Sequence, residues 1–232
     1  MHNGNVASPD DTASPYLCPF CLSYGDVTRY TLKETESFRL VTDYAPVIEG
    51  HLLIIPKQHY ACYGAVPASL DAELSALKQE VQAFLTRYYA PTVFWEHGVF
   101  RQTVFHAHLH CFPVGETYYD ATQRLHERMV HSQQDIRNWY HEHGHYFFLQ
   151  DSAYRYLFAP HMEAYRQIMQ NVLWAGVARR YHLTDTGRKP WRSPQQRQEE
   201  GIPLIAATRA KWRQFQEEQE GQHEQYINET SA

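Results

Sequence analysis

The feature that most constrains the fold of this chain is a run in which every second residue is a histidine, within Phe105–Phe112. Side chains of a β-strand alternate between the two faces of a sheet, so His106, His108 and His110 would share one face. The residues between them are alanine, leucine and cysteine, which would face a core. Imidazole is costly to bury without a partner, so the pattern predicts a polar strand face that binds a metal or an anion, or holds a hydrogen-bond network. The run alone leaves open a solvated strand face.

The hydropathy pattern elsewhere predicts a mixture of helices and strands. Leucine and aromatic residues recur at three- and four-residue steps over 69–90, which predicts a long helix that Ser69 caps and Pro91 ends. Short alternating or β-branched segments predict strands over 38–43, 51–56, 92–97, 103–112, 146–149 and 154–158. Further helices are expected within 121–140, from Pro160 to about 181, and over 202–220.

Composition bounds the class of protein. The 232 residues are 43% hydrophobic and 14% aromatic, which is enough for a buried core and excludes a wholly disordered chain. The formal net charge is −5, whereas proteins that bind nucleic acid through its phosphates are usually basic. The longest aliphatic run, Leu52–Ile55, is too short to cross a bilayer, and the polar N-terminus does not resemble a signal segment. A cytoplasmic protein that binds neither membranes nor nucleic acid is therefore expected.

A Cys-x-x-Cys pair, Cys18 and Cys21, precedes the first predicted strand. Two thiolates at this spacing can supply half of a tetrahedral zinc site. Free thiols and a redox-active pair remain open, although the turn-like residues 22–26 differ from the helix that a redox motif needs. A disulfide is disfavoured because nothing in the sequence suggests export. Cys62 and Cys111 are expected to be ordinary buried thiols.

A second histidine cluster, His141–His145, matches the His-Glu-x-x-His pattern of zinc proteases. That site needs a continuous helix, and Gly144 followed by the strand-like residues 146–149 argues against one. We therefore expect a solvated helix end, where the helix dipole favours cationic histidines.

Together with two other motifs, the histidine run resembles the signature of the histidine triad (HIT) superfamily, His-x-His-x-His followed by two apolar residues. The segment Asp43–His59 is similar to the superfamily's Asp-x-x-Pro, Gly-His and Ile-Pro-Lys-x-His block, and Gln102–Val104 matches the Gln-Ser/Thr-Val that precedes the triad. The likeness covers about residues 16–114. Arg101 replaces a usual glycine and Glu96–Gly98 replaces a usual Asn/Asp-Gly loop, both beside the expected phosphate site. These departures bear on substrate choice more than on reaction type.

The resemblance implies a nucleotide hydrolase or nucleotidyltransferase that acts at an α-phosphate. His108 would attack the α-phosphorus and form a covalent nucleotidyl-histidine, with its other ring nitrogen protonated and held by a backbone carbonyl. His110 would contact the phosphate or support the strand, and Thr103 would lie near the leaving group. Water or another acceptor would then take the nucleotidyl group. The alternatives are a non-catalytic nucleotide-binding module and a zinc-stabilised interaction protein.

The resemblance also implies which residues bind the nucleotide and the metal. Gln102 would hydrogen-bond the α-phosphate, Asp43 would bind the ribose hydroxyls, and Phe20 would form part of the apolar slot for the base. The residue types leave open a turn role for Asp43 and a core role for Phe20. No organic cofactor is expected. The ligands of a structural Zn²⁺ would be Cys18, Cys21, His59 and His106.

The fold that the resemblance implies is α+β: a HIT-like antiparallel sheet of about five strands with a long helix packed on it, and a helical C-terminal extension. Residues 1–15 are expected to be a disordered leader, 16–115 the HIT-like domain, and 116–232 an extension packed on that domain rather than a separate one. Superfamily members often dimerise, so a homodimer is expected, with a nucleotide or dinucleotide as substrate.

Overall fold

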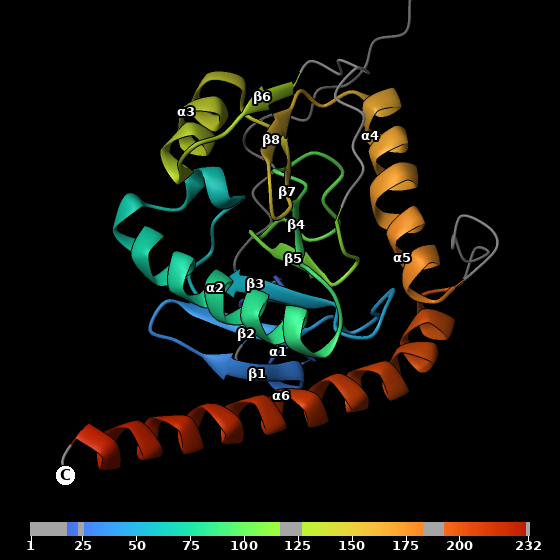
Figure 1. The fold of residues 1–232 in the computed structure, drawn as a ribbon. Helices are drawn as coiled ribbons and strands as arrows, with labels where there is room; N and C mark the ends of the chain where they lie inside the picture. The colour runs from blue at the N-terminus through green and yellow to red at the C-terminus, as the bar shows by residue number, and fades with distance from the viewer. Residues whose placement is uncertain (1–17, 23–25, 117–126, 183–192, 231–232) are drawn as a thin grey trace, which may run out of the picture.

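The computed structural model of the chain describes residues 18–22, 26–116, 127–182 and 193–230 (Figure 1). The expected leader, 1–15, lies outside the described residues. Over the described part, one eight-stranded sheet has the order β1-β2-β3-β5-β4-β7-β8-β6, and all neighbouring strands are antiparallel. The strands are β1 (Thr31–Glu34), β2 (Phe38–Thr42), β3 (Leu52–Pro56), β4 (Val93–Glu96), β5 (Leu109–Phe112), β6 (Glu127–Met129), β7 (Phe147–Gln150) and β8 (Arg155–Phe158).

The strand count differs from the expected five because the C-terminal half of the chain adds strands to the same sheet. β7 pairs with β4, for example at Leu149 and Trp95, and β8 and β6 follow outward. Without β7, the backbone N–H and C=O groups along this side of β4 would form an open edge. The α+β class, the antiparallel sheet and the C-terminal helices are confirmed, and the number of strands is corrected.

The predicted long helix is confirmed as α2, with Leu74, Leu77, Val81 and Phe84 buried along one side, but the expected cap is wrong, because Leu70 precedes the helix and no side chain caps it. The helix expected within 121–140 begins only at Gln133, because Ser132 and Asp135 form a capping box there. A π-helical turn, Met169–Trp174, interrupts the helix expected after Pro160. The helices are α1 (Asp26–Tyr30), α2 (Asp71–Tyr88), α3 (Gln133–His143), α4 (Met162–Ile168), α5 (Ala175–Arg180) and α6 (Pro194–Thr230).

The strand predicted over 103–112 is shorter than expected. Only Leu109–Phe112 pairs with β3 and β4, as strand β5. Residues 97–108 form an irregular loop, in which Val99 and Arg101 have positive φ angles of 76° and 55°. These angles lie before the predicted strand; within it, residues 103–106 form bends, and the Ala107 N–H donates to the Tyr60 carbonyl at 2.6 Å rather than to a neighbouring strand. His106 and His108 therefore come from this loop, and only His110 comes from a regular strand.

Each face of the sheet has its own cover. On one face, Phe84 of α2 packs with residues such as Ile54 of β3 and Phe94 of β4. On the opposite face, α4, α5 and the π-helical turn cover Trp95 and its neighbours. Beside them, α1 and the start of α6 cover the outward side of β2 and β3, including Leu53. Successive residues such as Leu53 and Ile54 thus reach opposite faces, as the pleat of a strand requires.

Helix α6 crosses one end of the sheet and contacts both faces (Figure 1). Ile205, near its start, is buried with Val41 and Leu53. Further along, Trp212 packs edge-on against Phe84 of α2, with ring centroids 5.0 Å apart. No helix among the described residues is long and apolar enough to cross a membrane.

Candidate active site

The three histidines of the run are divided between two sites. His106 is fully buried and faces Cys18 and Cys21. His108 and His110 line an adjoining pocket. His106 thus belongs to the cysteine cluster and His108 and His110 to the pocket, and the Phe20 ring packs edge-on against both His106 and His108.

His108 has a defined proton arrangement. Its Nδ1–H donates to the His106 carbonyl at 2.7 Å, and a carbonyl only accepts, so Nδ1 carries the proton and Nε2 has a free lone pair. Burial lowers the pKa of His108 below its usual value, so the ring is neutral near pH 7. The ring of Phe20 stands edge-on to it, with centroids 5.4 Å apart. The arrangement can present an uncharged nitrogen nucleophile.

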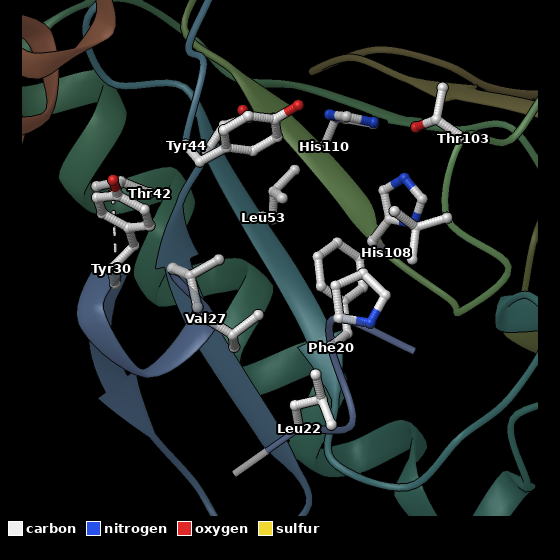
Figure 2. A pocket seen from close by; sticks show the side chains of 14 residues that line it. Phe20, Leu22, Val27, Tyr30, Thr42, Tyr44, Leu53, Thr103, His108 and His110 are labelled. Carbon is white, nitrogen blue, oxygen red and sulfur yellow. Dashed lines mark hydrogen bonds between the residues drawn. The ribbon is translucent and has the colours of Figure 1, made fainter. Parts of the chain in front are cut away.

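The pocket that His108 lines has a volume of about 440 Å³, within the range of small-molecule sites (Figure 2). Thr103, His108 and His110 gather at one end, and Asp43 and Tyr44 also line the pocket. The other end is apolar. It is lined by Phe20, Leu22, Val27, Val41 and Leu53. A pocket of this kind suits a ligand that is apolar at one end and polar or anionic at the other.

His110 is oriented by His51, which in turn lies beside Asp43 of the pocket lining. His51 Nε2 is 3.0 Å from His110 Nδ1, a hydrogen-bond distance, and Asp43 Oδ2 lies 3.8 Å from the same His51 nitrogen. The other oxygen of Asp43 accepts the Ala45 N–H at 2.7 Å, which holds the carboxylate in a turn.

These three side chains also form a geometric metal cluster, with their potential ligand atoms within 4.8 Å of one another. A metal-bound imidazole usually donates its second N–H to an acceptor. His51 Nδ1 is buried with no hydrogen-bond partner among the described residues. This favours a hydrogen-bonded His51–His110 pair over a metal site.

His51 and His97, which the sequence motifs did not identify as site residues, also lie beside His110. Burial lowers the pKa of both imidazoles, to about 4 for His97. His97 Nδ1 donates to the Phe100 carbonyl at 3.1 Å, and its ring centroid is 6.0 Å from that of His110. The signals were present, because His51 stands in the Gly-His motif and His97 in the unusual Glu-His-Gly segment.

The second site is a cluster of four potential metal ligands. Cys18 and Cys21 sulfurs and ring nitrogens of His59 and His106 all lie within 4.8 Å of one another. Cys21 Sγ is 3.2 Å from His59 Nδ1 and 3.3 Å from His106 Nδ1. Cys18 Sγ is 3.4 Å from His106 Nδ1. Tetrahedral zinc, with bonds of about 2.3 Å to sulfur and about 2.0 Å to nitrogen, holds such pairs about 3.5 Å apart. The donor set and its spacing fit Zn²⁺.

The proton arrangement of His106 also suits a metal ligand. Its Nε2–H donates to the Pro56 carbonyl at 2.8 Å, so Nδ1, which faces the two sulfurs, has the free lone pair. Burial lowers the pKa of His106 to about 4. Burial and the neighbouring Cys18 raise the pKa of the Cys21 thiol to about 11, so two thiolates here require a nearby cation.

Gln102 lies under the loop rather than in the pocket. Its amide nitrogen donates to the carbonyls of Ala61 at 3.1 Å and His106 at 2.8 Å. The His106 carbonyl thus accepts from both Gln102 and His108. Gln102 therefore holds the acceptor that keeps the His108 proton on Nδ1. Thr103, the next residue, does line the pocket (Figure 2).

The cluster His141–His145 is a solvent-exposed helix end. α3 ends at His143, and Gly144 adopts a left-handed conformation with φ of 74°. All of these residues are exposed. The prediction of a solvated helix end is confirmed.

Comparisons with known proteins identify the family of the chain. The family described as "Protein similar to CwfJ C-terminal" matches residues 7–126, a span that includes the cysteine pair and the histidine triad. An uncharacterized HIT-like protein of Mycoplasma genitalium is 32% identical over 105 residues, which are 43% of this chain and 74% of that protein.

Two solved structures are similar at lower identity. A hypothetical histidine triad nucleotide-binding protein from Sulfolobus tokodaii has 22% identity and a TM-score of 0.35, over 55% of this chain and 97% of that one. A Zn-bound histidine triad family protein from Mycobacterium smegmatis has 24% identity and a TM-score of 0.37, over 53% of this chain and 90% of that one. The family match and the mycoplasma relative establish the relationship by sequence. The chain belongs to the histidine triad superfamily of nucleotide-binding hydrolases and transferases.

Proposed function

We propose that this protein cleaves or transfers nucleoside monophosphate units, acting at the α-phosphate through a covalent nucleotidyl-histidine on His108. One observation carries the proposal. The neutral ring of His108 keeps its proton on Nδ1 and lines a pocket of about 440 Å³ that is polar at one end and apolar at the other. This combination supports a nucleotide as the ligand and His108 Nε2 as the nucleophile.

The reaction would proceed in two displacements at phosphorus. In the first, the Nε2 lone pair forms a P–N bond while the bond from phosphorus to the leaving oxygen, or to the leaving nitrogen of a phosphoramidate, breaks, and the leaving atom keeps the electron pair and gains a proton from solvent. The His108 ring becomes cationic, and the His106 carbonyl stabilises its Nδ1–H. In the second, water or another acceptor attacks phosphorus, loses a proton, and returns the P–N electron pair to Nε2. A neutral nucleophile avoids the repulsion that hydroxide meets from phosphate oxygens.

The pocket supports a role for each remaining binding residue. Phe20 would pack against the base at the apolar end, and Asp43 would accept hydrogen bonds from the ribose hydroxyls. Thr103 and His110 would contact the phosphate groups at the polar end. Gln102 would act through His106 and His108, since a direct bond to the α-phosphate would require its amide to leave two carbonyls.

A structural Zn²⁺ would be held by Cys18, Cys21, His59 and His106. Four protein ligands leave no open coordination position, so bound zinc would supply a crosslink between the N-terminal segment and the triad loop. His106 offers a ring nitrogen to the metal and a backbone carbonyl to His108. The crosslink would therefore also fix the acceptor that orients the nucleophile.

A substrate panel tests the proposal. It contains dinucleoside polyphosphates, nucleoside phosphoramidates, aminoacyl adenylates and nucleotide sugars, each with and without inorganic phosphate. Turnover by the wild type is expected, and phosphate-dependent formation of a new product would identify a transferase. His108→Ala should abolish turnover with zinc content and fold unchanged. His141→Ala, at the exposed end of α3, is the matched control and should retain full activity.

Intact-protein mass spectrometry tests the covalent step. An acid-labile nucleotidyl adduct that is absent from His108→Ala supports it. Tight nucleotide binding without adduct or product would identify a non-catalytic nucleotide-binding module, and the absence of both binding and turnover would favour a zinc-stabilised interaction protein. The homodimer and the cytoplasmic location stay predictions, which sedimentation and cell fractionation would test.

A further inference from the structure

The loop between β2 and β3, residues 43–50, supplies Asp43 and Tyr44 to the lining of the pocket and leads to His51. We propose that the C-terminal helices α5 and α6 position this loop, so that the nucleotide site is built from both halves of the chain. The identity of the ligand as a nucleotide rests on the proposed function, whereas the contacts that hold the loop are independent of it.

Helix α6 approaches the loop with its backbone at Gly201. A Cβ added to Gly201 would lie 2.6 Å from Cδ of Pro46 and 3.4 Å from the Tyr44 carbonyl oxygen. Carbon atoms do not pack at the first of these distances, and the proline ring cannot rotate away. A methyl group here would therefore displace the loop or the helix by about 1 Å. The contact sets the position of the loop at the residues beside Asp43.

A buried hydrogen bond holds the far end of the same loop. The Gly50 N–H donates to Thr208 Oγ1 at 2.9 Å, and the Thr208 hydroxyl donates to the Leu204 carbonyl at 2.7 Å. Thr208 is only 2% exposed, so water cannot readily replace this acceptor. The helix thus fixes the backbone immediately before His51.

Glu49 is held by both C-terminal helices. Lys211 Nζ of α6 is 2.9 Å from Glu49 Oε1, and Arg180 of α5 donates to the Glu49 carbonyl at 2.6 Å. The Glu49 N–H donates to the Tyr181 hydroxyl at 3.2 Å. The two cations also lie over the ring of Tyr89, 4.4 Å and 4.5 Å from its centroid. The C-terminal helices therefore contact the loop at three places, around Pro46, at Glu49 and at Gly50.

The same helix supports the apolar end of the pocket. Ile205 is buried in one cluster with Val27, Val41 and Leu53, which line that end. His108, in contrast, is held by the His106 carbonyl in a different loop. Displacement of residues 43–50 should thus weaken nucleotide binding and leave the chemical step nearly unchanged, which is a split between KM and kcat.

The main test compares two glycines of α6. Gly201→Ala adds a methyl group at the contact with Pro46, whereas a Cβ at Gly221 would meet nothing within 4 Å, so Gly221→Ala is the matched control. Both changes raise helix propensity equally. We expect Gly201→Ala to raise the Kd of AMP or GMP in calorimetry, and KM, by about tenfold or more, with kcat within about threefold of wild type. Unchanged Kd and KM, or an equal fall in kcat, would overturn the positioning role.

A second variant keeps the test decisive if Gly201→Ala does not fold. Thr208→Val keeps the shape of the side chain and removes the acceptor of the Gly50 N–H. Faster amide exchange over residues 43–51 without ligand is expected, together with weaker AMP or GMP binding. Unchanged exchange would refute the positioning role. Faster exchange in a protein whose wild type binds no nucleotide would support the positioning role and refute the proposed function.

Discussion

Replacement of the buried carboxyl of Glu96 by an amide should change how stability depends on pH. Glu96 lies on β4 in the core beneath α2 and is 1% exposed. Its Oε1 accepts the Tyr63 N–H at 2.7 Å, and its Oε2 accepts the Tyr146 hydroxyl at 2.5 Å. These bonds favour the ionised form, but burial outweighs them and raises the pKa of Glu96 to about 7.

The sign and size of the effect follow from this pKa. A carboxyl whose pKa rises on folding stabilises the native state at low pH, and that stabilisation is lost as the pH rises through the native pKa. A native pKa of about 7, compared with an ordinary pKa of 4.5, therefore lowers the free energy of unfolding by about 3 kcal/mol above pH 7 and by almost nothing below pH 4.5. Glu96→Gln does not titrate, so its free energy of unfolding relative to wild type should rise by about 2 kcal/mol between about pH 5 and about pH 7.5.

Urea unfolding at closely spaced pH values, with zinc present throughout, measures this difference. Any change in hydrogen bonding by the amide adds the same offset at every pH, and the titration of buried histidines cancels between the two proteins. Glu217→Gln, at an exposed position of α6, is the control and should show no pH-dependent difference. A Glu96→Gln difference that stays constant with pH would show that the native carboxyl titrates as it does in the unfolded chain, which would refute the reasoning.

Three other perturbations probe the two sites and the core. Removal of zinc by a chelator, or Cys18→Ser, should lower the melting temperature and kcat, because the His106 carbonyl that orients His108 would no longer be fixed by a metal-bound His106 ring. Metal analysis together with activity assays measures this, and full kcat in folded, zinc-free protein would contradict it. Asp43→Asn should weaken AMP binding about tenfold in calorimetry, since a neutral amide is a poorer acceptor for ribose hydroxyls; wild-type affinity would remove Asp43 from the ribose site. Phe84→Ala should lower the free energy of unfolding by about 3–5 kcal/mol, measured with urea, because the buried ring fills the space between α2 and Trp212; a loss below about 1 kcal/mol would show that the core closes around the gap.

Local patterns in the sequence predicted the elements in which buried residues recur at regular steps or in one continuous run. The three- and four-residue spacing of leucines predicted α2, and the aliphatic run before Pro56 predicted β3. The motifs also identified the four metal-cluster residues and His108, which the structure brings into two adjoining sites.

Features that depend on distant contacts could not be predicted in the same way. The pairing of β7 with β4 joins residues more than fifty positions apart, and the composition of either strand does not specify its neighbour. The alternating histidines suggested a strand through His106 and His108, because periodicity does not reveal that residues 103–106 bend and that the Ala107 N–H bonds the Tyr60 carbonyl instead of a neighbouring strand. The position of Gln102 depends on carbonyls of two separate segments, which a motif cannot show.

The order of the strands also decides how a second molecule could associate with this one. Since β7 of the same chain occupies the side of β4, β1 and β6 stand at the margins of the sheet formed by the described residues. β6 has three residues, and β1 has an irregular register and carries Lys33 and Glu34. Short, irregular and charged margins discourage intermolecular addition of a strand. The edges of the described sheet therefore favour a homodimer that forms through side-chain surfaces over one that shares a continuous sheet.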